Sequence, residues 1–435
     1  MLSAFRSALA TPDLRKKILF TLGIVAVYRL GAAIPSPGVS YPNVQECLQR
    51  VTNGENSQVY SLLNLFSGGA LLQLSIFALG IMPYITASII IQLLTVVIPR
   101  FEQLKKEGQS GQNKLTQYTR YLTIALAVLQ STGIVALVRN DGLLGDCPNA
   151  IPDKSVFSSL IIVVVMTAGT AVIMWLGEQV TERGIGNGMS LLIFASIAAR
   201  IPAEGANILQ NSSPLVFAGV CVFGLAIIAS VVFVEQGQRR IPVQYAKRMI
   251  GRRMYGGTST YLPLKVNQAG VIPVIFGSSL LYLPDLISRL AGATGGGFQQ
   301  FVQTYLVDQS NPVHILLYVA LIIFFTYFYV GITFNPEERA DEMKKFGGFI
   351  PGIRPGRPTA EYLQYVLSRI TLPGSLYLGI VAVLPNFFLG ITGSGGNQNF
   401  PFGGTAVLIM VGVGLDTVKQ IESQLMQRNY EGFLR

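Results

Sequence analysis

Ten long apolar runs alternate with polar, charged segments along the whole chain. A helix needs roughly 20 mostly apolar residues to cross a bilayer. The runs do not alternate with a period of two, as the strands of a membrane barrel would. The pattern therefore predicts an all-α polytopic membrane protein with ten transmembrane helices. The predicted spans cover about 18–34, 74–98, 119–138, 156–177, 186–201, 214–234, 268–286, 313–334, 370–391 and 402–421.

Composition and charge placement support this count. The 435 residues are 50% hydrophobic and only 12% charged, against about 25% charged in soluble domains. If both termini are cytoplasmic, most of the 32 Lys and Arg residues fall on the inner side. This positive-inside asymmetry requires an even number of spans. The exceptions are Arg29, Arg50, Arg139, Lys154, Arg200 and Arg289.

The N-terminal region and the cysteines leave alternatives open. The basic triplet 15–17 precedes the first apolar run, and no convincing cleavage site follows, so we interpret the run as span one. Cys47 and Cys147 both fall in predicted outer loops. They form either a disulfide or two unrelated thiols. Cys221 is interpreted as ordinary packing inside a span.

A six-residue pattern occurs twice, as Gly80-Ile81-Met82-Pro83-Tyr84-Ile85 and Gly270-Val271-Ile272-Pro273-Val274-Ile275. Glycine and proline both weaken a helix. The two copies lie five spans apart, so their spans run in opposite directions. Either the similarity is a chance echo, or it marks an inverted repeat with a site between its halves. The repeat predicts two halves of five helices, 1–201 and 214–435, joined by a hinge loop at 202–213.

Three segments outside the spans stand out. The outer segment 60–70 is apolar but too short to cross, so it is either re-entrant or lies on the surface. The inner loop 235–267 carries clustered cations. The inner loop 335–369 contains the stiff tip Pro351-Gly352-Ile353-Arg354-Pro355-Gly356.

The sequence offers little catalytic chemistry. It contains no phosphate-binding loop, a single histidine (His314) and no zinc-like cysteine spacing. Asn187 in the stretch 184–188 is interpreted as a helix cap in a tight turn. We therefore predict no enzyme, no cofactor and no metal site. Only Arg29 and Asp416 lie inside plausible span limits, both near one end, where snorkelling explains them.

Three motifs resemble the SecY family of channel subunits of the Sec translocon. They are the stretches 77–85 (FALGIMPYI), 175–188 (WLGEQ with ERGIGNG) and 349–356 (FIPGIRPG). The resemblance runs through the whole chain and implies a ten-helix clamshell with a central pore. It implies that unfolded secretory polypeptides with signal sequences pass through, and that transmembrane segments leave sideways into lipid.

The resemblance also implies site residues. An apolar pore ring would resist the passage of hydrated ions. At one ring position Met189 stands in place of the family's usual isoleucine. The alternative is that the ring residues face lipid or pack inside the protein. The ring would be Ile81, Ile85, Met189, Ile193, Ile275 and Ile409. A plug beneath it would contain Tyr60, Leu62, Leu63, Leu65, Phe66, Ser67, Gly68 and Gly69. The lateral gate, between spans two–three and seven–eight, would contain Thr86, Gln130 and Asn267, for which generic interhelical bonding is the alternative.

Partners follow from the same resemblance. The small membrane subunits SecE and SecG, the SecA ATPase and the ribosome are implied, with basic loops meeting ribosomal RNA; anionic lipid is the alternative partner of these cations. The docking residues would be Arg239, Arg240, Lys247, Arg248, Arg252, Arg253 and Arg354. The implied location is the bacterial inner membrane, with energy supplied by a partner. A small-solute transporter and a pore-less scaffold are the competing functions.

Overall fold

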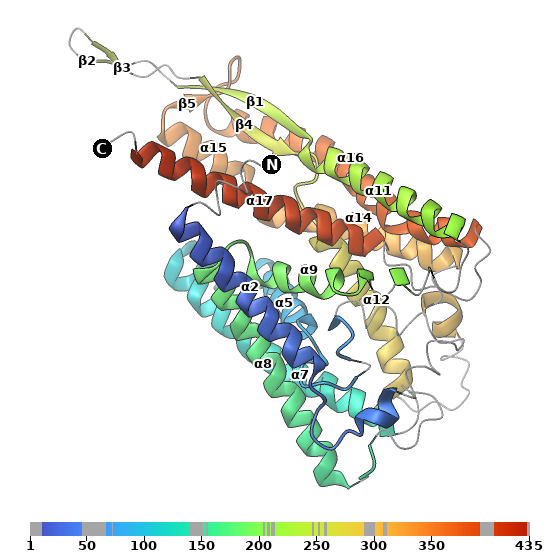
Figure 1. Ribbon diagram of the computed structural model, residues 1–435. Helices are drawn as coiled ribbons and strands as arrows, with labels where there is room; N and C mark the ends of the chain where they lie inside the picture. Colours follow the sequence, from blue (N-terminus) through green and yellow to red (C-terminus); the bar gives the residue numbers. More distant parts are fainter. Residues whose placement is uncertain are drawn as a thin grey trace.

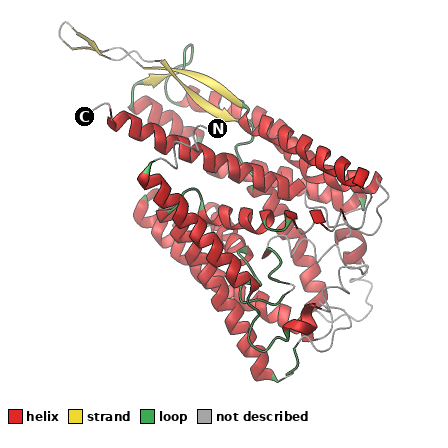
Figure 2. Ribbon diagram, in the orientation of Figure 1, coloured by secondary structure: helices red, strands yellow, loops and turns green. Residues whose placement is uncertain are grey.

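The computed structural model describes residues 11–45, 67–71, 73–139, 151–153, 155–202, 205–206, 209, 214–245, 248–250, 253–255, 259–290, 301–307, 311–391 and 404–432. Helices dominate this part of the chain (Figure 2). The main helices of the first half are α2 (Pro12–Ala33), α5 (Met82–Val97), α6 (Pro99–Lys106), α7 (Gln109–Arg139), α8 (Val156–Arg183) and α9 (Gly188–Ala198). Those of the second half are α11 (Pro214–Gln236), α12 (Ile272–Leu290), α14 (Pro312–Thr333), α15 (Pro336–Lys345), α16 (Arg357–Ile391) and α17 (Gly404–Gly432). A short π-helical turn, η1 (Gln303–Val307), lies between α12 and α14.

The helices form two groups (Figure 1). In the first, α7 packs on both α5 and α8, and α2 packs on α8 and α9. In the second, α14 and α17 pack on α16, and α11 packs on α17. The groups meet where α9 packs on α17 and where α12 packs on α5 and α7. Residues on α9 and α12 therefore lie between the two groups.

Several helices are individually suited to a bilayer. Within the described residues, five segments are long and apolar enough to cross it, in α7, α8, α11, α14 and α16. The pair α5 and α6 meets this test together but is bent by 100° at Ile98. The helix α9 is apolar but short, with 11 residues.

Some predicted span limits differ from the helices. Span two was expected from residue 74, but α5 starts only at Met82, because Gly80 and Pro83 delay the helix. Span five was expected over 186–201, yet α9 ends at Ala198. Predicted span nine, 370–391, is the C-terminal part of a longer helix, since α16 begins at Arg357, inside the predicted inner loop.

The basic inner loop is a β-hairpin, which the hydrophobic pattern did not predict (Figure 2). Strand β1 (Gln238–Tyr245) pairs antiparallel with β4 (Ser259–Lys265), from Gln238 opposite Lys265 to Gln244 opposite Ser259. The short strand β5 (Gly348–Phe349), from the second inner loop, pairs on the other side of β1. A second pair, β2 (Arg248–Ile250) and β3 (Arg253–Tyr255), lies farther out along the hairpin. The two long loops thus share one sheet.

The start of α2 lies beside the later part of α17, on the side of the molecule that carries the strands (Figure 1). Leu14 of α2 packs with Ile185 and with Ile421 of α17. Lys17 Nζ donates a 3.5 Å hydrogen bond to Gln424 Oε1. The two ends of the described chain therefore lie on the same side of the molecule, as an even number of spans predicts.

Candidate functional site: an apolar cluster between the two halves

The two copies of the repeated hexapeptide have the same backbone conformation. Gly80 and Gly270 have φ angles of +57° and +63°, a region that suits glycine. Two residues after each glycine a helix begins, α5 at Met82 and α12 at Ile272. Each motif is therefore a helix start rather than an interruption within a helix.

The prolines and isoleucines of the motifs fit these helix starts. Pro83 and Pro273 are the second residues of their helices, where a missing N–H costs nothing. The sixth residue then makes the first full helical bond in both copies. Ile85 N donates to Ile81 O at 3.1 Å, and Ile275 N donates to Val271 O at 3.3 Å. The matched geometry favours an inverted repeat over a chance similarity between the two hexapeptides.

The short helix α9 starts at a side-chain cap. Asn187 Oδ1 accepts from the backbone N–H groups of Met189 and Ser190, at 3.1 and 3.4 Å. The predicted cap at Asn187 is thus confirmed. It fixes the start of α9, and with it the direction of Met189 and Ile193 one turn apart.

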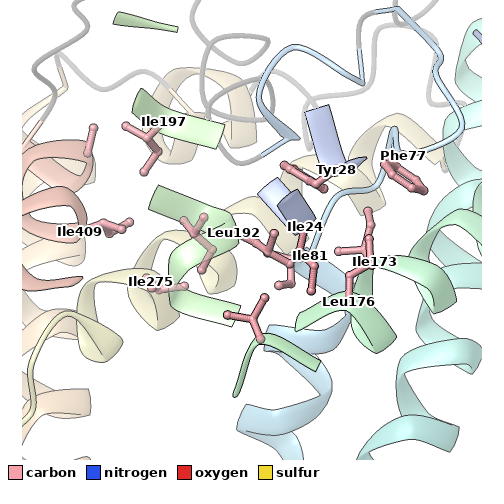
Figure 3. Close-up of a cluster of buried hydrophobic side chains, with 13 residues drawn as sticks. Ile24, Tyr28, Phe77, Ile81, Ile173, Leu176, Leu192, Ile197, Ile275 and Ile409 are labelled. Carbon is pink, nitrogen blue, oxygen red and sulfur yellow. The ribbon is translucent and has the colours of Figure 1, made fainter. Parts of the chain in front are cut away.

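The six residues predicted for the ring belong to one apolar cluster, and Figure 3 shows part of it. They come from four elements: the start of α5, α9, α12 and α17. Four are buried, with exposed fractions of 1% (Ile81), 3% (Ile193), 8% (Ile275) and 1% (Ile409). Ile85 and Met189 are partly buried and pack against them. Both halves of the repeat therefore contribute to one closed, aliphatic contact.

The cluster is larger than the predicted ring. On α9, Leu192 and Ile197 extend it, and the helical spacing from Met189 was a sequence signal for them. Toward the right of Figure 3 the cluster continues into the first half. The additional buried members there are Ile24, Tyr28, Phe77, Ile173, Leu176 and Val180. Ala406 of α17 also belongs to it.

An aliphatic contact of this kind has a clear physical property. It offers a hydrated ion no group that can replace the water around it. Its four buried side chains are at most 8% exposed, so they leave little room for water between them. Separating the six ring side chains would cost dispersion and apolar burial, and these side chains have no hydrogen bonds to break.

Only the end of the predicted plug lies in the described part of the chain. Tyr60, Leu62, Leu63, Leu65 and Phe66 fall outside the described residues. Ser67 is buried, and its Oγ accepts from Leu71 N at 3.3 Å. Gly68 and Gly69 follow with φ angles of +64° and +95°. The segment 67–71 is therefore a tight, packed turn.

This turn is held against the cluster. Arg29 of α2 donates from Nη1 to the carbonyl oxygen of Gly68 at 3.2 Å. A Cβ on Gly68 would lie 3.2 Å from the Cα of Ser196 on α9, so the turn touches α9 three residues beyond Ile193. Ser196 in turn shares a 2.7 Å hydrogen bond with Tyr28. Arg29 thus binds backbone within the protein, in place of the snorkelling expected from sequence.

The predicted lateral-gate residues are not hydrogen-bonded to one another. Thr86 donates to Met82 O in its own helix, at 3.0 Å. Asn267 Nδ2 donates to the buried carboxylate of Glu235 and to Gly270 O. Gln130 lies half-buried on α7. The helices α5 and α7, which carry Thr86 and Gln130, do pack on α12, which begins five residues after Asn267. Asn267 itself is hydrogen-bonded within the second half.

An ion pair was missed in the sequence interpretation. Arg120 of α7 binds Glu178 of α8 with two hydrogen bonds of 2.9 Å, Nε to Oε1 and Nη2 to Oε2. The side chains are 39% and 16% exposed. Both residues lie at predicted span ends, where the sequence alone does not distinguish loop from helix.

The predicted docking residues lie on the strands and the adjoining loop. Arg239 and Arg240 are exposed on β1, and the Arg240 guanidinium lies 4.8 Å from the ring centre of Tyr261 on β4. Arg354 is exposed at the tip that precedes α16. Arg248 and Arg253 belong to the outer strand pair. Lys247 and Arg252 fall outside the described residues, as do Cys47 and Cys147.

The family is decided by a match over most of the chain. The SecY family model matches residues 75–418, which include both hexapeptides and all six residues of the predicted ring. The chain belongs to the SecY family. Among the described residues, no group of three or more His, Cys, Asp or Glu residues is arranged to hold a metal ion.

Proteins of the SecY family resemble this chain over its full length. A protein from Mycobacterium tuberculosis (strain ATCC 25618 / H37Rv) named protein translocase subunit SecY is 72% identical, with 100% of both chains covered. One of the same name from Streptomyces coelicolor (strain ATCC BAA-471 / A3(2) / M145) is 63% identical, again with 100% of both covered.

Solved structures agree in fold. The structure described as "The structure of a protein conducting channel" has a TM-score of 0.65 and 18% identity, with 94% of this chain and 91% of that chain covered. Sec61 in a canine ribosome-channel complex from the endoplasmic reticulum has a TM-score of 0.60 and 19% identity, with the same coverage. The predicted fold class, a ten-helix polytopic SecY-type fold, is thereby confirmed, with the small sheet as an addition.

Proposed function

We propose that the chain is the central protein-conducting channel subunit of a Sec translocon. It moves unfolded secretory polypeptides across the membrane and releases apolar transmembrane segments sideways into lipid. The observation that carries this proposal is the closed aliphatic cluster to which both repeat halves contribute, in a member of the SecY family. Its relatives at 72% identity bear the name of a protein translocase subunit.

In this proposal the six-residue ring separates around a threading chain. An extended polypeptide presents changing side chains, and an aliphatic ring favours none of them while it limits water and ions. The turn 67–71 is the anchored end of a plug that rests on the ring, because Arg29 and α9 hold it there. The lateral opening lies between α5–α7 and α12–α14, and an apolar signal sequence entering it gains by partitioning into lipid.

The chain itself makes or breaks no bond in this proposal. Energy comes from a partner docked on the shared sheet and its loops: the SecA ATPase or the ribosome. The exposed arginines Arg239, Arg240 and Arg354 are the described docking residues, and phosphate of ribosomal RNA is a suitable target for them. SecE and SecG complete the complex. The location is the bacterial inner membrane, with both termini cytoplasmic.

A photocrosslinking experiment tests the channel. A photoreactive amino acid is placed in turn at Ile81, Ile193 and Ile409, and a secretory chain is trapped in mid-export. Crosslinks are expected at all three positions. Ile173 is the matched control, since it belongs to the same cluster but is fully buried behind the ring on α8. A trapped chain that reaches none of the three ring positions would disprove the proposal.

A further inference from the structure

The helix α6 brings two lysines across to the second half of the molecule. It follows α5 after a 100° bend and belongs to the first half. Lys105 Nζ donates a 3.3 Å hydrogen bond to the carbonyl oxygen of Ile332, 227 residues later, in the last turn of α14. This contact joins the helices on either side of the proposed lateral opening.

The acceptor is available because of the sequence that ends α14. The helical partner of the Ile332 carbonyl would be the N–H four residues on, at Pro336, and proline has none. Asn335, before the proline, is extended, with φ −92° and ψ 108°, as expected at that position. The Ile332 oxygen therefore has no donor in its own helix. A helix C-terminus also carries partial negative charge, which attracts a lysine.

The neighbouring charges also favour contact between α6 and α15. Lys106 forms a 2.7 Å ion pair with Glu102 in its own helix. That hydrogen bond and charge raise the pKa of Lys106, and Glu338 of α15 adds in the same direction. The acidic start of α15 is thus near the cationic end of α6. The two elements attract each other beyond the single bond of Lys105.

We infer that Lys105 is a cytoplasmic latch that holds α6 against the α14–α15 corner and favours the closed lateral opening. The latch rests on the proposed function for the meaning of that opening. Deeper in the membrane the same two sides meet through α12 packing on α5 and α7. The latch closes the end of the seam where the apolar contact of α5 stops at Ile98.

The latch is weak, as a reversible closure requires. The loss of a solvent-exposed charged contact should raise the open fraction by a factor of about 1.4 to 5. Opening is a shift between populations that already exist, and one exposed bond biases it without locking it.

Distance measurement between spin labels tests the latch. The three native cysteines are replaced by serine, and labels are placed on exposed Arg100 of α6 and exposed Asp341 of α15. The protein is measured as the assembled complex in lipid by pulsed electron resonance. Lys105→Met should increase the long-distance fraction by a factor of about 1.4 to 5. Lys105→Arg, which can still donate to the carbonyl, should restore the native distribution.

The matched control is Lys114→Met. Lys114 is exposed on the same side and pairs at 3.8 Å with Glu107, within the first half. It should leave the distances unchanged. An unchanged distribution in Lys105→Met, an equal shift in Lys114→Met, or failure of Lys105→Arg to restore closure would each overturn the latch.

This outcome is independent of the channel itself, because no substrate is present. If the ring crosslinks fail while Lys105→Met still shifts the distances, the latch between halves stands and the channel does not. If the crosslinks form and the distances do not shift, the channel stands and the latch does not.

Discussion

Gly80 and Gly270, 190 positions apart, begin two helices with the same left-handed turn. A Cβ added at Gly270 would meet nothing within 4 Å, so substitution there strains only the backbone. Gly270→Ala should therefore destabilise the protein by about 1–2 kcal/mol. Thermal unfolding in detergent measures this cost. Gly331→Ala is the control, since Gly331 is helical with open space around it and should be neutral or slightly stabilising.

The seal should fail when the ring becomes polar. Ile275→Asn places an amide in the aliphatic cluster, where an unpaired amide costs about 1–3 kcal/mol. The wet, separated state then becomes on the order of tenfold more populated. Ion conductance of the complex in a planar bilayer should rise accordingly. Ile275→Leu keeps the apolar surface and should not leak, and equal conductance of the two variants would contradict the ring.

The anchored turn should loosen without Arg29. A hydrogen bond from a charged group is worth about 1.5–3 kcal/mol, so Arg29→Gln should expose the turn roughly tenfold to a hundredfold more often. The measurement is the labelling rate of a cysteine at Ser67, which is 3% exposed, in a protein lacking its native cysteines. Arg29→Lys should give an intermediate rate. A labelling rate that Arg29→Gln does not change would argue against the anchor.

Replacing one member of the Arg120–Glu178 ion pair should destabilise the protein more than replacing both members with apolar residues. Glu178→Gln leaves a partly buried guanidinium without its carboxylate and should cost about 1–2 kcal/mol, a value reduced by the exposure of Arg120. The double variant Arg120→Met with Glu178→Leu should recover much of that loss. A double-mutant cycle on thermal stability measures the coupling. Additive losses would mean that the two charges do not cooperate.

Docking should depend on charge at the exposed tip. Arg354→Glu should slow SecA-driven export and leave thermal stability unchanged, because Arg354 is exposed. Lys344→Glu makes the same charge change on the exposed face of α15 and should export normally. The difference between the two should shrink as salt rises, since exposed charges are screened within about 10 Å at 0.1 M. Equal rates for both variants would remove the specific role of Arg354.

Much of the membrane part was predictable because apolar length and charge asymmetry act locally along the chain. Family resemblance predicted the six ring residues, which share one apolar cluster in the structure, and capping chemistry predicted the role of Asn187. The hydrogen-bond partners of side chains that lie far apart in the sequence could not be predicted in the same way. Asn267 bonds Glu235 rather than Thr86 or Gln130, and this depends on how the end of α11 and the segment before α12 lie in space.

The β-hairpin was missed for a different reason. Its strand β1 carries three exposed polar residues before the buried Ile241 and Val243, so the alternation is short. Arg240 and Pro242 interrupt any apolar signal. The pairing is set instead by the partner strand β4, whose Leu264 completes a small core with Ile241 and Leu363 of α16.

The hairpin is also a lever arm. Its base is closed by Val266 N bonding to Gly237 O at 3.0 Å, and the next residue, Asn267, is tied to Glu235 and to the turn at Gly270. Seven paired residues give the arm a reach of roughly 23 Å. A displacement of the outer strands would therefore act on two helices: on α16, through the packing of Leu264 against Leu363, and on the first turn of α12, the turn that carries Ile275.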